Sequence, residues 1–108
     1  MIYAGLDVGS RTIKLVTYDY VVMESVIVET GVNPLQRCQQ LVGERQIDRM
    51  VVTGYGRHLV ARTLDGDAIS EIGAYAAGAR RLYPDCGTVI DIGGHYSRTD
   101  VFSFSVLR

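Results

Sequence analysis

The chain alternates between short apolar runs and polar turns, and the apolar runs predict the secondary structure. Residues 1–8 are mostly apolar, so we expect a central strand that is buried on both faces of a sheet. The runs that follow are rich in valine, isoleucine and other residues that favour strands, and polar turns separate them. The strands predicted in this way span residues 1–8, 12–20, 21–30, 47–53, 88–92 and 100–107.

A helix is predicted after the third strand, where Asn33 precedes Pro34. Asparagine is a favourable N-cap, and proline is preorganised for the first helical position. Apolar residues then recur every three or four positions up to Gly43, as on one face of a helix. A short helix over residues 59–64 and a second helix over residues 70–82 are also expected. With the short helix left uncounted, the order β-β-β-α-β-α-β-β predicts a mixed α/β sheet with helices packed on it.

The composition favours one globular domain, because 47% of the 108 residues are hydrophobic and 21% are charged. The formal net charge of −1 predicts no nucleic-acid partner, and no polybasic run marks a membrane surface. The apolar runs are shorter than a membrane span, and the first residues lack the charged start of a signal peptide. We therefore expect a cytoplasmic protein in which Cys38 and Cys86 are free, partly buried thiols.

The first candidate site is the turn that follows the first strand. Its tip offers main-chain N–H groups, hydroxyls and a cation, which are the groups that bind a phosphate. Asp7, just before the tip, repels a phosphate but can bind a divalent cation such as Mg²⁺, which would join it to the phosphate. Lys14, in the next strand, points either to the phosphate or to solvent. The residues of the tip are Gly9, Ser10, Arg11 and Thr12.

A strand end of the same kind lies near the other end of the chain. Residues 88–92 form an apolar run that contains Asp91 and is followed by Gly93 and Gly94. One Asp-x-Gly is a weak signal, because many strands end in such a turn, but two of them after β-branched runs are moderately specific. We therefore expect Asp7 and Asp91, with their glycine turns, to converge on one metal-bound phosphate.

Two further positions each keep two interpretations. Arg57 ends the turn Thr-Gly-Tyr-Gly-Arg at residues 53–57, which follows a predicted strand at the end where open α/β sheets bind ligands. Its side chain contacts a nucleotide or a partner protein, or the segment is a flexible turn with an exposed arginine. Glu71 is in the first turn of a predicted helix, where it stabilises the helix dipole or faces the active cleft.

Four segments of the chain resemble those of a known family. Their order resembles one half of the actin, Hsp70 and sugar-kinase ATPase superfamily, whose fold is ribonuclease-H-like. The Thr-Gly-Tyr-Gly-Arg turn between two Asp-x-Gly turns makes the resemblance closer to the ATPase activators of 2-hydroxyacyl-CoA dehydratases and benzoyl-CoA reductases, also called CoA-substrate-specific enzyme activases. The four segments are Gly5–Ser10, Thr53–Arg57, Ser70–Glu71 with Gly78–Ala79, and Thr88–Gly94.

The resemblance implies an ATPase that drives electron transfer. Such activators are homodimers with one 4Fe–4S cluster at the interface, and ATP hydrolysis moves a low-potential electron into the dehydratase or reductase component. Asp7 and Asp91 would hold Mg²⁺ through water, and one of them would orient the attacking water. The phosphates of ATP or ADP would be held from two sides, by Gly9, Ser10, Arg11 and Thr12 and by Gly93 and Gly94.

Some positions depart from this family. After the second turn, Tyr96 stands where the family usually has an acid, and Arg98 stands where it has a lysine. Residues 1–108 are expected to form a single N-terminal ATPase lobe. The second lobe, with the cysteine ligands of the cluster, is expected to be absent from this chain. Such a lobe alone should bind nucleotide weakly and hydrolyse almost none.

Two other interpretations of the whole chain remain open. The first is a non-catalytic module that has the same fold and self-associates through an exposed surface of the lobe. The second is a fragment of a sugar or acetate kinase, in which a substrate-binding lobe would follow.

Overall fold

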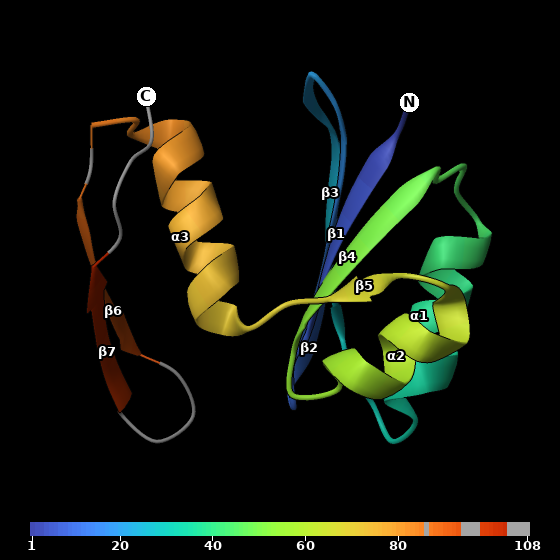
Figure 1. The fold of residues 1–108 in the computed structure, drawn as a ribbon. Helices are drawn as coiled ribbons and strands as arrows, with labels where there is room; N and C mark the ends of the chain where they lie inside the picture. Colours follow the sequence, from blue (N-terminus) through green and yellow to red (C-terminus); the bar gives the residue numbers. More distant parts are fainter. Residues whose placement is uncertain (86, 94–97, 104–108) are drawn as a thin grey trace. The chain divides into compact units, whose positions relative to one another are not determined.

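The computed structural model describes residues 1–85, 87–93 and 98–103, and it describes residues 89–93 and 98–103 by their backbone alone. These residues belong to two compact units, Met1–Ser70 and Glu71–Arg108, which are described separately. The elements in Figure 1 are β1 (Tyr3–Val8), β2 (Thr12–Asp19), β3 (Val21–Glu29), α1 (Pro34–Gly43), β4 (Arg49–Gly54), α2 (Arg57–Leu64), β5 (Asp67–Ala68), α3 (Glu71–Leu82), β6 (Thr88–Gly93) and β7 (Arg98–Ser103).

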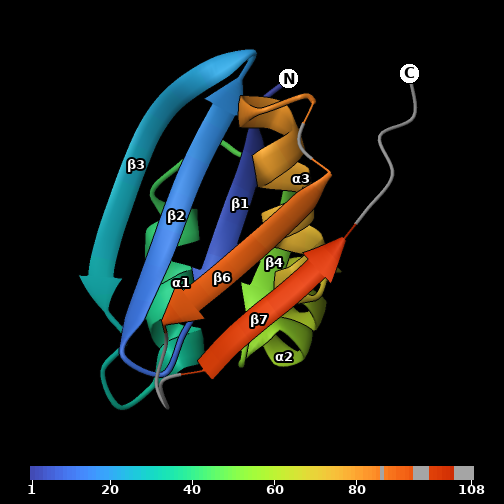
Figure 2. The same cartoon turned by 90° about the vertical axis from the view of Figure 1, so that its left-hand side faces the viewer.

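The first unit is built on a five-stranded sheet with the strand order β3-β2-β1-β4-β5, of which Figure 2 shows β3, β2, β1 and β4 side by side and Figure 1 labels β5. β1, β2 and β3 form an antiparallel meander, whereas β4 pairs in parallel with β1 and β5 pairs in parallel with β4. The mixed α/β sheet predicted from the sequence is therefore confirmed. The two-residue strand β5 was not expected, and α2 begins at Arg57 rather than at residue 59.

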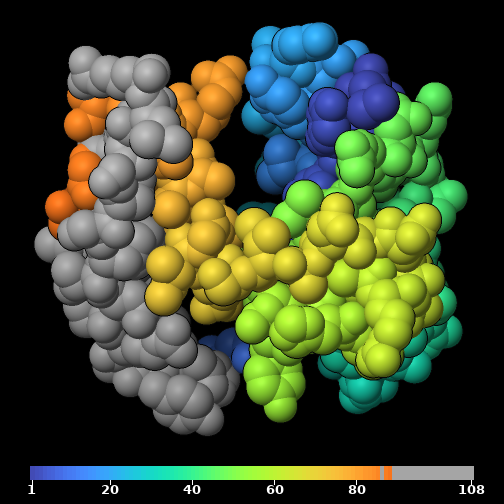
Figure 3. Space-filling view, in the orientation of Figure 1, coloured from blue at the N-terminus to red at the C-terminus, as the bar shows by residue number. Residues whose placement is uncertain are grey.

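The core of the first unit lies between one face of the sheet and the helices α1 and α2, which pack against each other. In the space-filling view of Figure 3, α1 (teal) and α2 (yellow-green) form part of the outer surface of this unit. β1 buries Ala4, Leu6 and Val8, whereas Tyr3 and Gly5 are exposed, because successive side chains of a strand point to opposite faces. The prediction that this strand is buried on both faces is therefore wrong, since α1 and α2 cover a single face. The other buried apolar residues of this core are Ile13, Leu15, Cys38, Leu41, Met50, Val52, Val60 and Ala61.

Helix α1 begins as its sequence predicts. The Asn33 side chain accepts a hydrogen bond of 3.1 Å from the Gln36 N–H, and Pro34 is the first helical residue, so the predicted N-cap is confirmed. Just after the helix, the Arg45 guanidinium donates hydrogen bonds of 2.8 and 3.1 Å to the two carboxylate oxygens of Glu24 on β3. These bonds lower the pKa of the Glu24 carboxyl and attach the end of the helix to the edge strand of the sheet.

The second unit consists of α3 and the antiparallel hairpin β6–β7, in which Asp91 is opposite Asp100 in the backbone register. The last predicted strand begins at Arg98 rather than at residue 100, and its residues 104–107 lie outside the described part of the chain. Cys86 and Gly94 also lie outside it. Within the described residues, no helix has the length and apolar character needed to cross a membrane.

Candidate functional site

Asp7 lies near the carboxyl end of β1, on the face of the sheet opposite the core. Its neighbours in the adjacent strands are Lys14 on β2 and Thr53 on β4. Asp7 Oδ2 is 3.6 Å from Lys14 Nζ, and the side chains of the lysine and the aspartate are 51% and 38% exposed. Lys14 therefore points to this carboxylate, and its contact with a phosphate stays a prediction. An ion pair this exposed contributes about 0–1 kcal/mol, so a cation can replace the lysine at small cost.

Gly54, at the end of β4, leaves the room that the Asp7 carboxylate occupies. Its φ is +97°, and a Cβ added there would lie 2.8 Å from Asp7 Oδ1 and 2.5 Å from the Val8 carbonyl oxygen. A side chain at this position would meet the main chain of β1 and push the carboxylate away. The first glycine of the Thr-Gly-Tyr-Gly-Arg motif is therefore required by the close approach of β4 to the end of β1.

The rest of this motif forms a loop over the end of β1. The Arg57 guanidinium donates a hydrogen bond of 3.1 Å from Nη1 to the Gly54 carbonyl, and the Gly56 N–H donates one of 3.4 Å to the Val8 carbonyl. Arg57 thus fastens the loop on itself, in a role that differs from both interpretations of the sequence. Its contact with a nucleotide or a partner protein stays a prediction.

The turn between β1 and β2 leaves two main-chain donors available. The Gly9 N–H donates a hydrogen bond of 3.0 Å to the Thr12 carbonyl, so it is used within the turn and is not available to a phosphate. Among the described residues, the N–H groups of Ser10 and Arg11 make no hydrogen bond. The phosphate-binding capacity predicted for the tip therefore rests on these two N–H groups, the hydroxyls of Ser10 and Thr12 and the guanidinium of Arg11.

Thr30 belongs to this site although the sequence analysis did not single it out. Its hydroxyl donates a hydrogen bond of 2.8 Å to the Gly9 carbonyl, and its N–H donates one of 2.9 Å to the Arg11 carbonyl. The only signal in the sequence is a hydroxyl residue before a glycine at the end of the third strand, which is too common to identify a site.

The chemistry of these groups fits a magnesium ion that bridges to a phosphate. Mg²⁺ keeps several waters and is held in proteins by one or two carboxylates together with substrate phosphates. Asp7 offers such a carboxylate, and beside it in the β1–β4 register the Thr53 Oγ1 is buried with no hydrogen-bond partner among the described residues. The described residues contain no group of three or more His, Cys, Asp or Glu that could hold a metal by themselves. Among the side chains that the structure describes, a metal at Asp7 would thus be held by this one carboxylate, together with phosphate and water.

The predicted second side of the phosphate site lies in the other unit. Asp91 and Gly93 are in β6, where only the backbone is described, and Gly94 lies outside the described residues. The convergence of Asp91 with Asp7 therefore stays a prediction. Glu71 is in the first turn of α3, which is the position of a helix-dipole partner, and its orientation toward a cleft also stays a prediction.

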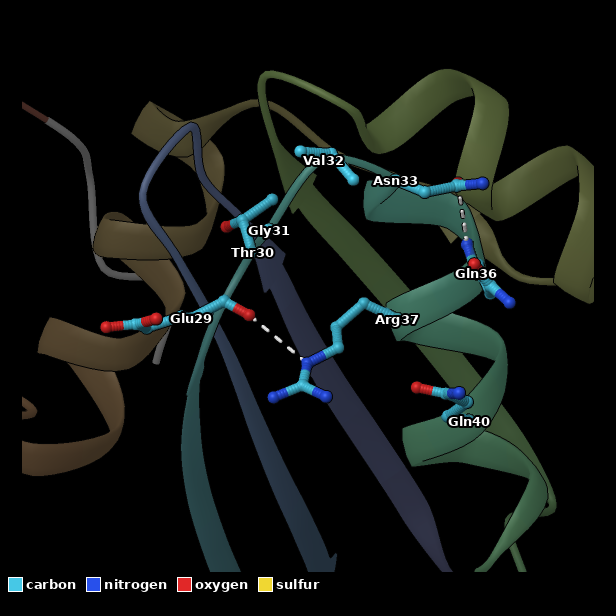
Figure 4. Close-up of a pocket in the computed structure, with 8 residues that line it drawn as sticks. All are labelled: Glu29, Thr30, Gly31, Val32, Asn33, Gln36, Arg37 and Gln40. Atoms are coloured by element: carbon cyan, nitrogen blue, oxygen red, sulfur yellow. Dashed lines mark hydrogen bonds between the residues drawn. The ribbon is translucent and has the colours of Figure 1, made fainter.

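An open surface pocket of about 270 Å³, lined mostly by polar residues, lies between the end of β3 and α1 (Figure 4). Arg37 donates a hydrogen bond of 3.2 Å from Nε to the Glu29 carbonyl across it. No pattern in the sequence marks this pocket, because its helical residues resemble an ordinary solvated face. It is lined by Glu29, Thr30, Gly31, Val32, Asn33, Gln36, Arg37 and Gln40.

Cys38 is a free thiol with no exposed surface, and its burial raises the pKa of the thiol from 9.0 to about 11. In a Cys86→Ser variant, where Cys38 is the only cysteine, we expect iodoacetamide to label the native protein far more slowly than the protein in urea, because the thiolate is the reactive form. The Cys38 thiol ionises at a lower pH in the unfolded chain than in the folded one, so it has no effect on stability below about pH 9. As the pH rises from 9 toward 11, its ionisation in the unfolded chain destabilises the fold.

Mass spectrometry after timed labelling measures the two labelling rates, and rapid labelling of the native protein would contradict the burial.

The fold can be assigned from solved structures. No family model matches the chain. A ROK family protein from Streptococcus pneumoniae is similar with a TM-score of 0.67 at 14% identity, over 86% of this chain and 43% of that chain. At this identity the similarity shows the fold alone. Together with the mixed sheet and its strand order, it places the chain in the actin-like ATPase and sugar-kinase fold class.

Within that class, the similar sequences include activators of CoA-ester dehydratases. The 2-hydroxyisocaproyl-CoA dehydratase activator of Clostridioides difficile is 37% identical over 101 residues, which are 83% of this chain and 37% of that protein. The activator of lactoyl-CoA dehydratase of Anaerotignum propionicum is 40% identical over 101 residues, 83% of this chain and 38% of that protein. The structure of the activator from Clostridium difficile with bound ADPNP has a TM-score of 0.72 at 30% identity, over 97% of this chain and 41% of that chain.

The chain is therefore a relative of the 2-hydroxyacyl-CoA dehydratase activators, and the resemblance inferred from its motifs is confirmed. It spans about two fifths of the length of the relatives that it matches.

Proposed function

We propose that this chain supplies the phosphate-binding side of an ATP-dependent activator, which donates low-potential electrons to a 2-hydroxyacyl-CoA dehydratase or a benzoyl-CoA reductase. The observation that carries the proposal is the placement of Asp7. Its carboxylate is accessible, pairs only weakly with Lys14 and lies over Gly54, next to a turn with two available N–H donors. An accessible anion beside donors for an anion suits a cation and a phosphate that bind together.

Each residue of the site has a separate task in this proposal. Mg²⁺, when bound, would be held by Asp7 and, from the other side, by Asp91, and it would neutralise charge on the phosphates of ATP. The N–H groups of Ser10 and Arg11 donate to phosphate oxygens. With a cation held at Asp7, Lys14 would be free to donate to the phosphates instead of to the Asp7 carboxylate. Asp7 or Asp91 orients the water that attacks the terminal phosphate.

The remaining parts of the proposed activator follow from the resemblance of the sequence motifs. We propose a cytoplasmic homodimer, in which a 4Fe–4S cluster at the interface receives and passes on the electron. Thiolate ligands are required for such a cluster. The burial of Cys38 and the raised pKa of its thiol argue against Cys38 as one of these ligands.

Calorimetric titration of the chain with Mg·ADPNP tests the proposal. We expect weak binding, with a Kd of about 0.1–10 mM, because a single lobe offers only half of the nucleotide cleft. Removal of Mg²⁺ with EDTA should weaken it, and AMP, which lacks the terminal phosphates, should show no binding in the same range. The absence of any heat with Mg·ADPNP would contradict the proposal. Tight binding with rapid ATP hydrolysis would instead contradict the expectation that this lobe offers only half of the nucleotide cleft.

A further inference from the structure

Thr30 connects the turn of the candidate site to a distant part of the chain. It is 2% exposed and immediately follows β3. Its hydroxyl hydrogen bond to the Gly9 carbonyl joins residues that are 21 positions apart in the sequence. The turn between β1 and β2 is therefore held by the segment that leads into α1, in addition to its own short-range bonds.

The hydrogen bond from the Thr30 hydroxyl to the Gly9 carbonyl determines where the Ser10 N–H points. A trans peptide is planar, and its C=O and N–H point in opposite directions. The Gly9 carbonyl points to the Thr30 Oγ1 at 2.8 Å, so the Ser10 N–H of the same peptide must point away from Thr30, out of the turn. This is one of the two donors of the turn that have no partner among the described residues.

The main chain of Thr30 fixes the other side of the turn. Its N–H donates a hydrogen bond of 2.9 Å to the Arg11 carbonyl. Thr30 therefore holds the carbonyls of Gly9 and Arg11, the residues on either side of Ser10. Figure 4 shows Thr30 where the chain leaves β3 toward α1, a helix that Asn33 caps and Arg37 ties to the Glu29 carbonyl. Thr30 therefore has a rigid support from which to hold the turn.

We propose that Thr30 is a positioning residue that aims the Ser10 N–H at a phosphate of the bound nucleotide. The inference rests on the proposed function, since it assumes that a phosphate binds at this turn. A preorganised donor binds its anion without first losing conformational freedom, so loss of the Thr30 hydroxyl should weaken nucleotide binding although Thr30 touches no nucleotide.

The test compares Thr30→Val, which keeps the shape and removes the donor, with Thr30→Ser, which keeps the donor. In calorimetric titrations of the chain with Mg·ADPNP, we expect Thr30→Val to raise the Kd about tenfold and Thr30→Ser to stay within about twofold of the wild type. Thr17→Val is the matched control, because Thr17 is also buried but lies further along β2. It is four residues beyond Ile13, the residue that pairs with Val8 next to the turn. This substitution should leave the Kd unchanged.

A second measurement uses the wild-type chain and does not depend on the folding of a variant. The amide proton of Ser10, observed by NMR during the titration, should shift strongly downfield as Mg·ADPNP binds. If the nucleotide binds and the Ser10 amide does not respond, or if Thr30→Val binds like Thr17→Val, the role of Thr30 is refuted while the proposed function stands. If the wild type binds no nucleotide, the proposed function itself fails, and the role of Thr30 fails with it.

Discussion

Replacing Gly54 by alanine is expected to destabilise the chain by about 3–5 kcal/mol, at the upper end of single substitutions. Two effects add up at this position. An alanine at a φ of +97° is strained whatever surrounds it. Its Cβ would also lie 2.5 Å from the Val8 carbonyl oxygen, which is main chain of the central strand and cannot move cheaply. Urea unfolding followed by circular dichroism measures the change in the free energy of unfolding.

Two other glycines separate these effects. Gly31 has a φ of +73° but no atom within 4 Å of an added Cβ, so Gly31→Ala should cost about 1–2 kcal/mol from backbone strain alone. Gly43, in the last turn of α1, has open space and an ordinary φ, so Gly43→Ala should be neutral or stabilising by up to about 1 kcal/mol. A Gly54→Ala variant no less stable than Gly31→Ala would show that the contact with β1 is not as close as the structure has it.

The parts of the fold and site that depend on neighbouring residues could be predicted from the sequence. The meander of β1 to β3 follows from adjacent apolar runs with short turns, and the start of α1 follows from Asn33 and Pro34 side by side. Asp7 was a candidate because its strand, its glycine and its hydroxyl residues are contiguous. In each case the interacting groups are within a few positions of one another, so spacing alone carries the information.

The parts that depend on distant residues could not be predicted. Thr30 contacts Gly9 across 21 positions, and no local pattern marks the pair. The contact of Gly54 with Asp7 exists because β4 pairs in parallel with β1, a register that only the three-dimensional structure provides. The burial of β1 was predicted incorrectly for a related reason, since a mostly apolar strand does not reveal which of its faces the helices cover.

Replacing Asp7 by asparagine is expected to weaken the binding of Mg·ADPNP about tenfold or more, because a charged metal-ligating group becomes neutral at nearly constant shape. Stability should change by less than about 1 kcal/mol, since the lost ion pair with Lys14 joins side chains that are 38% and 51% exposed. Calorimetry with and without Mg²⁺, together with urea unfolding, measures both quantities. Asp67→Asn is the control, because it makes the same change of charge at an exposed position on β5.

The sign of the effect should depend on the metal. With Mg²⁺ the aspartate attracts the nucleotide through the cation, whereas with EDTA the same carboxylate repels the bare phosphates. Asp7→Asn should therefore bind Mg·ADPNP more weakly than the wild type but bind metal-free ADPNP equally well or better. General damage to the fold would weaken both, and an unchanged dependence on Mg²⁺ would exclude Asp7 as the residue that holds the metal. This crossover therefore separates a metal-bridged phosphate site from any role of Asp7 that is confined to its pairing with Lys14.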